Sequence, residues 1–202
     1  MALLSIKTRQ KYLKELGFYT GKVDGIEGHL TKQAYLGLQT TYFSRKKDRD
    51  GLYGKNTDIL LRSAYNLRNS QNFNLQEFKC KCGGKYCTGY PAVVDENLVN
   101  DLQKLRAHYD KSVTITSGLR CKTYNAKIGG VKNSSHTKGK AVDIFVNKQS
   151  ANLEGREAIV DFWDTLPNAK YAYCNGYMKY VGKKATIYNS KTMGNATHVN
   201  VK

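Results

Sequence analysis

Residues 134–143 read Ser-Ser-His-Thr-Lys-Gly-Lys-Ala-Val-Asp, and the expected C-terminal fold is built around this stretch. His136 lies in a polar, glycine-containing loop, and Asp143 lies within the apolar strand that follows. In that strand, Asp143 shares one face with Ala141 and Phe145. A carboxylate among core residues is costly to bury unless it meets a cation or several hydrogen-bond donors. The stretch therefore predicts a strand that carries part of a metal site.

A second strand-like segment, residues 197–201, supplies a candidate third ligand. Its alternation places Val199 and Val201 toward the core, while His198 and Asn200 share the opposite face. Two imidazoles and one carboxylate leave one position open for water, which is typical of a catalytic zinc site. Spacing alone leaves the plainer alternative open, because a histidine and a nearby aspartate usually have no joint function.

Helices and strands are expected to alternate around these two segments. One helix begins after Asp95, its N-cap, and another covers residues 153–165. The segments with β-type composition are residues 112–117, 140–146, 170–174, 177–181 and 197–201. This order predicts an α+β fold with an antiparallel sheet.

The first 67 residues contain an internal repeat. Residues 24–31, Asp-Gly-Ile-Glu-Gly-His-Leu-Thr, are followed by the similar residues 50–57, Asp-Gly-Leu-Tyr-Gly-Lys-Asn-Thr. Each copy predicts a glycine-closed turn, with Thr31 or Thr57 capping the helix that follows. Together with a first helix that ends near Gly17, the repeat predicts a small three-helix module.

The polar residues 68–75 lack a periodic apolar face and are expected to form a linker. The predicted organisation is therefore a helical module (1–67), the linker (68–75) and an α+β domain (76–202). No apolar run approaches the roughly 18 residues that cross a bilayer, so no membrane insertion is expected. Lys7 follows the start too soon for a signal peptide, so we expect synthesis in the cytoplasm without one.

The formal charge of +17 indicates polyanionic partners. Candidates are nucleic acid, an anionic membrane surface, or a cell wall loaded with phosphate polymers. The basic residues are spread along the chain without a long run, which disfavours a nucleic-acid-binding tail. The acidic residues are less even, because no Asp or Glu follows Asp164.

Three of the five cysteines, Cys80, Cys82 and Cys87, form a tight cluster in the sequence. With a fourth ligand such as Cys121 they could hold a structural zinc. Their spacing is not that of a C-x-x-C knuckle, so two disulfides, one disulfide with spare thiols, or reduced cysteines remain alternatives. An odd number of cysteines without a signal peptide disfavours a full disulfide framework.

Three motifs resemble the zinc D-alanyl-D-alanine carboxypeptidase and L-alanyl-D-glutamate endopeptidase family. Residues 134–143 match every fixed position of its S-x-H-x-x-G-x-A-x-D signature. Residues 116–120, Thr-Ser-Gly-Leu-Arg, resemble its S-G-x-R segment, and residues 198–202, His-Val-Asn-Val-Lys, resemble its closing H-V-D-V-R. The resemblance covers roughly residues 75–202.

This resemblance implies a zinc peptidase and assigns roles to individual residues. It makes His136, Asp143 and His198 the ligands of one catalytic Zn²⁺. It makes Arg120 the contact for a substrate carboxylate or for the developing oxyanion. Around these residues we expect Ser134 to shape its loop and Asn200 to orient the His198 ring.

The general base is not identified by the sequence. Many relatives place Asp, Glu or His one to three residues before the last ligand, where this chain has Asn195, Ala196 and Thr197. None of these takes up a proton near neutral pH. A catalytically weak protein is therefore kept as an alternative.

Residues 16–25, Leu-Gly-Phe-Tyr-Thr-Gly-Lys-Val-Asp-Gly, resemble the "LGFYTGxxDGxxGxxT" pattern of peptidoglycan-binding domains. This second resemblance covers residues 5–67. Together the two imply a bacteriophage endolysin that cuts a peptidoglycan stem peptide or cross-bridge after passing a holin-type pore. The cleaved bond is not specified, so endopeptidase and D-Ala-D-Ala carboxypeptidase both stand. The alternatives are a wall-binding protein with weak or no activity, and a basic nucleic-acid-binding protein.

Overall fold

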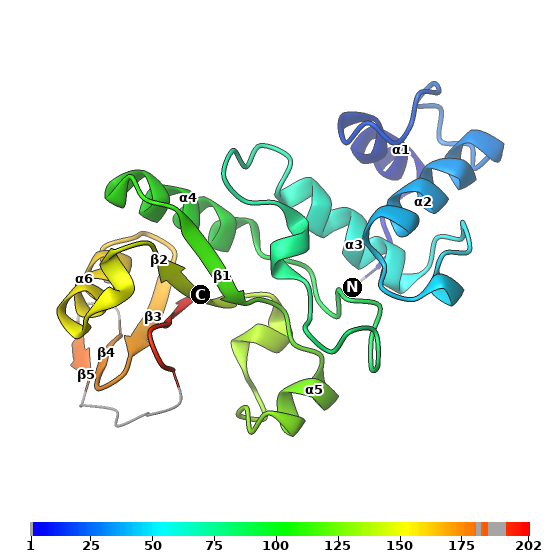
Figure 1. The fold of residues 1–202 in the computed structure, drawn as a ribbon. Helices are drawn as coiled ribbons and strands as arrows, with labels where there is room; N and C mark the ends of the chain where they lie inside the picture. The colour runs from blue at the N-terminus through cyan, green and yellow to red at the C-terminus, as the bar shows by residue number, and fades with distance from the viewer. Residues whose placement is uncertain (1, 181–182, 186–192) are drawn as a thin grey trace.

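The computed structural model describes residues 2–180, 183–185 and 193–202. The N-terminal helices gather at one end of the molecule and the β-sheet lies at the other (Figure 1). Within the described residues, no helix is both long enough and apolar enough to span a membrane.

Three α-helices form the N-terminal part: α1 (Ile6–Glu15), α2 (His29–Tyr42) and α3 (Lys55–Asn66). A short 3₁₀ helix, η1 (Lys46–Asp48), follows α2. The inward faces of the three α-helices contribute Leu13, Leu38 and Leu60, each fully buried. Each of these leucines lies on the apolar face that the sequence pattern indicates for its helix.

The two repeated turns are built differently from the expectation. The N-caps of α2 and α3 are Gly28 and Gly54, not the threonines. Thr31 and Thr57 lie inside the first helical turn, and their hydroxyls donate to the carbonyls of Ile26 and Leu52. The capping prediction was therefore wrong, because each threonine closes the preceding loop instead.

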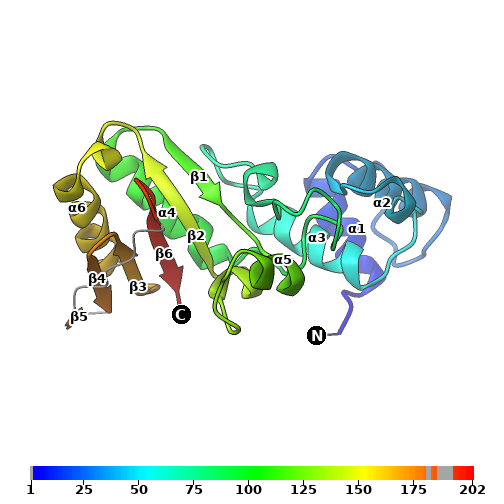
Figure 2. The same cartoon turned by 60° about the horizontal axis from the view of Figure 1, so that its bottom comes forward.

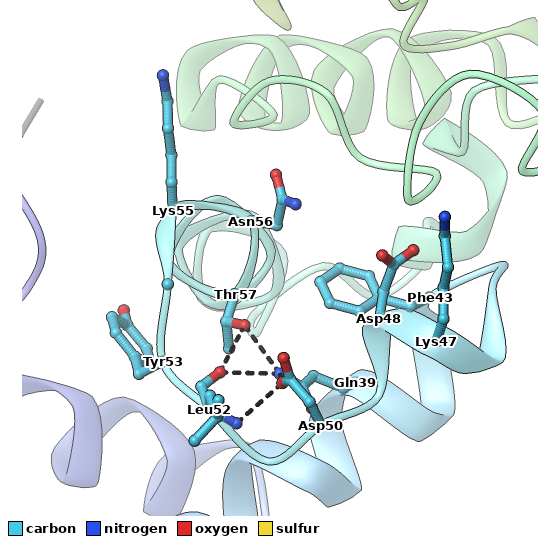
Figure 3. Close-up of a pocket in the computed structure, with 11 residues that line it drawn as sticks. Gln39, Phe43, Lys47, Asp48, Asp50, Leu52, Tyr53, Lys55, Asn56 and Thr57 are labelled. Atoms are coloured by element: carbon cyan, nitrogen blue, oxygen red, sulfur yellow. Dashed lines mark hydrogen bonds between the residues drawn. The ribbon is translucent and has the colours of Figure 1, made fainter.

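A buried glutamine fixes each repeated turn, a feature that the sequence reading did not find. The Nε2 of Gln39 donates to the Asp50 carboxylate, the Leu52 carbonyl and the Thr57 hydroxyl, at 2.9–3.0 Å (Figure 3). Its Oε1 accepts from the backbone N–H of Gly51 at 2.8 Å. Gln10 makes the same set of contacts in the first copy, with Asp24, Gly25, Ile26 and Thr31.

The segment expected to be a linker joins the packed structure. Phe73 and Leu75 are buried, at 4% and 3% exposure, and a 3₁₀ helix, η2 (Leu75–Phe78), begins within it. Two further hydrogen bonds join the helical part to Val94. The Asn66 side chain donates to the Val94 carbonyl, and the Val94 N–H donates to the Ser63 hydroxyl.

Within residues 113–180, 183–185 and 193–202, the strands form a six-stranded antiparallel sheet of order β1-β2-β6-β3-β4-β5. This confirms the expected α+β fold with an antiparallel sheet. The strands are β1 (Val113–Ser117), β2 (Ala141–Val146), β3 (Ala169–Cys174), β4 (Tyr177–Tyr180), β5 (Lys183–Ala185) and β6 (Thr197–Val201).

Two helices, α4 (Glu96–Tyr109) and α6 (Leu153–Asp164), contact each other and the sheet (Figure 2). The Asp95 side chain caps α4, as the sequence predicts. On α6, the fully buried Trp163 donates from its Nε1 to the Asn200 carbonyl of β6 at 3.0 Å. The shorter elements are α5 (Lys122–Lys127), η3 (Ser135–Lys138) and η4 (Gln149–Ala151).

Candidate metal centre

Three different elements position the expected metal ligands. His136 lies on η3, Asp143 lies in the middle of β2, and His198 lies on β6. The antiparallel register places Asp143 directly opposite His198. The chain turns from η3 toward β2 at Gly139, whose φ of +76° suits glycine. This turn returns His136 toward the strand that carries Asp143.

One nitrogen or oxygen atom from each of the three side chains meets at a single point. His198 Nδ1 lies 2.8 Å from Asp143 Oδ1, and His136 Nε2 lies 3.2 Å from each of these atoms. All three residues are buried. A tetrahedral zinc with bonds of about 2.0–2.1 Å separates its ligand atoms by about 3.3 Å. The observed triangle fits such an ion.

The ring of His136 is oriented for metal binding. Its Nδ1 lies 2.7 Å from the carbonyl oxygen of Gly118, which can only accept a hydrogen bond. Nδ1 therefore carries the proton, and Nε2 presents its lone pair toward Asp143 and His198. This is the outer hydrogen bond that commonly fixes the tautomer of a metal-binding histidine.

His198 lies beside two tyrosine rings, and one of its ring nitrogens has no hydrogen-bond partner among the described residues. Tyr173 and Tyr171 stack near its ring, with centroids at 4.6 Å and 5.5 Å. Its Nε2 is buried and has no hydrogen-bond partner among the described residues. The nitrogen of His198 that faces the triangle is therefore Nδ1.

The local electrostatics favour the forms that bind zinc. Burial raises the pKa of the Asp143 carboxyl, but its close contacts with His136 and His198 outweigh burial and hold that pKa well below its usual range. Burial lowers the pKa of His198 against the opposing pull of Asp143. The site thus combines a carboxylate with a neutral imidazole at neutral pH.

Arg120 closes the outer side of the carboxylate. Its guanidinium bonds to Asp143 Oδ2, the oxygen that does not face the histidines, and to the hydroxyl of Ser117 at 2.8 and 3.0 Å. Its side chain is 15% exposed and lines the pocket described below. The structure thus brings Arg120 to the site, and its contact with substrate stays a prediction.

Ser134 and Asn200 are both buried near the ligands but make few polar contacts. Ser134 precedes η3 and uses its carbonyl to accept the Thr137 hydroxyl at 2.6 Å. The side-chain atoms of Asn200 have no hydrogen-bond partner in the described part of the chain. No hydrogen bond from Asn200 to His198 is formed there, so the expected orienting contact is not made.

A pocket of about 330 Å³ opens onto the three ligands. Its wall includes Arg120, Ser134, Tyr171, Tyr173 and the Gly129–Gly130 turn. Among the described residues that line it, Asp143 is the single carboxylate. Asn195 lines a neighbouring hollow and accepts from Arg156 at 3.2 Å. The general base is therefore still not identified.

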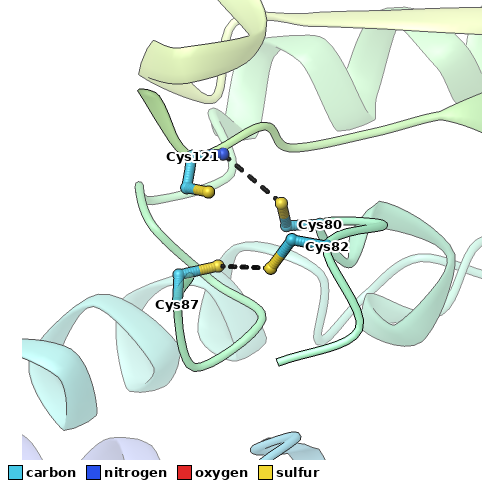
Figure 4. A group of neighbouring side chains, drawn as sticks. All are labelled: Cys80, Cys82, Cys87 and Cys121. Carbon is cyan, nitrogen blue, oxygen red and sulfur yellow. Dashed lines mark hydrogen bonds between the residues drawn. The ribbon is translucent and has the colours of Figure 1, made fainter. Parts of the chain in front are cut away.

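A second group of metal-binding side chains lies apart from this pocket. Cys80, Cys82 and Cys87 meet Cys121 (Figure 4). All five cysteines, including Cys174, are free thiols in the structure. The sequence named Cys121 only as one candidate fourth member. It could not place this residue, because Cys121 reaches the group through the fold.

Two comparisons with known proteins point to one family. Residues 71–166 match the profile of the family "Peptidase M15". The chain is also 29% identical, over 137 residues, to a "Zinc D-Ala-D-Ala carboxypeptidase" of Streptomyces albus G. That alignment covers 63% of this chain and 51% of the relative, so the chain spans about half the length of this curated protein. Both matches support the peptidase M15 family and imply a zinc cofactor, and His136, Asp143 and His198 form one group of side chains that could hold such an ion.

Proposed function

We propose that this protein is a zinc-dependent peptidase that hydrolyses a peptide bond in bacterial peptidoglycan. One observation carries the proposal. Two buried imidazoles and a buried carboxylate place three ligand atoms 2.8–3.2 Å apart at the base of a pocket. The similarity to a zinc carboxypeptidase supports the metal and the class of substrate.

His136, Asp143 and His198 would hold the ion. Bound zinc supplies a Lewis acid for the scissile carbonyl and lowers the pKa of water. The Gly118 carbonyl keeps His136 in the tautomer that leaves Nε2 free, and the Arg120 guanidinium holds the Asp143 carboxylate in place through Oδ2. The remaining N–H groups of Arg120 are suited to a substrate carboxylate or to the charge that develops on the carbonyl oxygen.

Two substrates fit this arrangement and differ in their products. A carboxypeptidase would bind the free terminal carboxylate of a stem peptide beside Arg120 and release one amino acid. An endopeptidase would accept a chain that continues past the site and would cut the wall network. Mass spectrometry of the fragments released from purified walls separates the two.

The endolysin role is also part of the proposal. The formal charge of +17 favours a wall rich in phosphate polymers. The N-terminal helices, similar in sequence to peptidoglycan-binding domains, would hold the enzyme on its substrate. Synthesis in the cytoplasm and passage through a holin-type pore complete this proposal.

A second candidate function is a wall-binding protein with weak or no turnover. It is favoured by one observation, the lack of a carboxylate other than Asp143 among the described residues that line the pocket. Turbidity loss of purified walls, with and without chelator, distinguishes it from the peptidase.

The deciding test is the substitution His198→Ala, with His108→Ala as the matched control. His108 is exposed near the end of α4, outside the N-terminal helices, and is not one of the ligands. We expect His198→Ala to lose the zinc of this site and all wall hydrolysis, while His108→Ala keeps both. Chelation and zinc restoration of the wild-type protein give the same answer without a substitution. Hydrolysis that survives either treatment would refute the mechanism.

A further inference from the structure

Four cysteine side chains converge at the junction between the helical part and the sheet. Cys80, Cys82 and Cys87 lie on the loop between η2 and α4. Cys121 directly precedes α5 and follows Arg120 in the chain. Their four sulfur atoms all lie within 4.8 Å of one another (Figure 4).

The spacing of the sulfurs fits one tetrahedral ion. Four thiolates bonded to zinc at about 2.3 Å are separated from each other by about 3.8 Å. The Sγ atoms of Cys82 and Cys87 lie 3.4 Å apart, and the limit for the whole set is 4.8 Å. Two disulfides would join the sulfurs in pairs at about 2.05 Å and would not require all four to meet.

We propose that Cys80, Cys82, Cys87 and Cys121 bind a structural zinc ion, separate from the catalytic site. Four thiolates complete the tetrahedral shell and leave no position for water, which is the composition of a structural site. Cys80 and Cys121 are buried, and Cys82 and Cys87 are half-buried, so the ion would be shielded from solvent.

The backbone around the cluster is shaped to hold sulfur. The N–H of Cys121 donates to Cys80 Sγ at 3.3 Å, an outer contact of the kind that stabilises metal-bound ligands. The loop reverses after Cys82, where Lys85 N–H donates to the Cys82 carbonyl at 3.0 Å. Gly83 and Gly84, at φ of +62° and +85°, permit this tight turn.

The surrounding charge suits an anionic centre. Zinc with four thiolates carries a net charge of about −2. Lys79, Lys81 and Lys85 alternate with the cysteines along the loop. Arg45, from the helical part, packs against Gly84 of the same loop while its guanidinium pairs with Asp48. The three lysines partly offset the net negative charge of the proposed zinc–thiolate centre.

The ion would hold residues 118–121, the segment that supports the catalytic site, in a fixed position. Gly118 and Arg120, which contact His136 and Asp143, immediately precede Cys121. The same segment bonds to the end of η2, where Leu119 N–H donates to the Phe78 carbonyl at 2.8 Å. A zinc bound to both sides of this junction would fix the distance between them.

The test is a zinc count on reduced, purified full-length protein. We expect about two zinc ions per wild-type chain and about one for each of His198→Ala and Cys82→Ala. The double variant should hold none. Cys174→Ala, a buried cysteine outside the cluster, is the matched control and should retain about two. Because the two sites are counted separately, failure of the catalytic proposal is distinguished from failure of this one.

A second measurement protects the test against a variant that misfolds. X-ray absorption of the zinc that stays bound to the His198→Ala protein should show only sulfur neighbours, at about 2.3 Å. Alkylation of the native wild-type protein should modify Cys82 and Cys87 only after chelator is added. A wild-type zinc count that Cys82→Ala leaves unchanged, the absence of sulfur neighbours around the zinc, or an intact mass that shows disulfide-bonded cysteines in the cluster would each overturn the proposal.

Discussion

Gly139 shows how much of the site depends on a single residue without a side chain. It lies between η3 and β2 and lets the chain turn so that His136 and Asp143 meet. A Cβ at this position would come to 1.8 Å from the Val93 carbonyl oxygen. The N–H of Asp95 donates to the Gly139 carbonyl at 3.0 Å, so the contact also anchors the start of α4.

We therefore expect Gly139→Ala to lower the free energy of unfolding by more than about 3 kcal/mol, since strain and a backbone clash add. Gly17→Ala is the matched control, with a similar φ of +78° and no atom within 4 Å of the added Cβ. It should cost about 1–2 kcal/mol from strain alone. Urea unfolding measures both variants. Equal losses would show that the approach to Val93 has no effect.

Arg120 contributes a planar guanidinium that bonds to Asp143 and Ser117 together. Lysine keeps the charge but cannot reproduce this fork. We expect Arg120→Lys to lower kcat/KM about 10–100-fold while much of the bound zinc is retained. Arg106→Lys, at a half-buried arginine that pairs with the exposed Asp110 at the end of α4, is the control and should leave both unchanged. Metal content and fragment release on one preparation test this, and an unchanged kcat/KM would exclude the role.

Among the larger elements, the strands that carry the ligands were the most predictable from sequence. Alternation in residues 141–146 and 197–201 places Asp143 and His198 on defined faces, and the structure pairs them in register. Periodicity could not reveal the partners of the repeated turns. Gln10 and Gln39 look like ordinary polar helix residues in the sequence, and only the fold buries them against the loops. Cys121 is a similar case, because its three partners are distant in sequence.

A substitution can test how much the Gln39 side chain stabilises the second repeated turn. Gln39→Ala removes four hydrogen bonds and leaves buried groups of the turn without partners. We expect a loss of about 2–4 kcal/mol in the free energy of unfolding. Gln33 is exposed on the same helix, so Gln33→Ala controls for helix propensity. It should change the free energy of unfolding by less than about 0.5 kcal/mol. Equal effects would show that the turn is held by other contacts.

At the scale of the whole molecule, one hydrophobic core runs from the N-terminal helices to the last strand. Leu13 and Leu38 belong to the same cluster as Tyr90, Leu102 and Val201. Backbone contact between Ser44 and Thr88, at 2.9 Å, adds to this continuity. The part proposed to bind the wall is therefore packed against the part that carries the site, so wall binding, as proposed, would bring the pocket close to the wall.

The charge of the whole chain makes this positioning dependent on salt. With 33 basic and 16 acidic residues, attraction to an anionic wall is long-ranged at about 0.1 M salt, where the Debye length is about 10 Å. At about 1 M salt the Debye length falls to about 3 Å. We therefore expect the affinity of the His198→Ala protein for intact walls to drop at least about tenfold. Walls stripped of phosphate polymers should bind with a weaker salt dependence. Cleavage of a short soluble stem peptide by the wild-type protein should change less than about twofold, because the buried site is screened little. Equal affinity for intact walls at both salt concentrations would show that contacts other than charge hold the protein there.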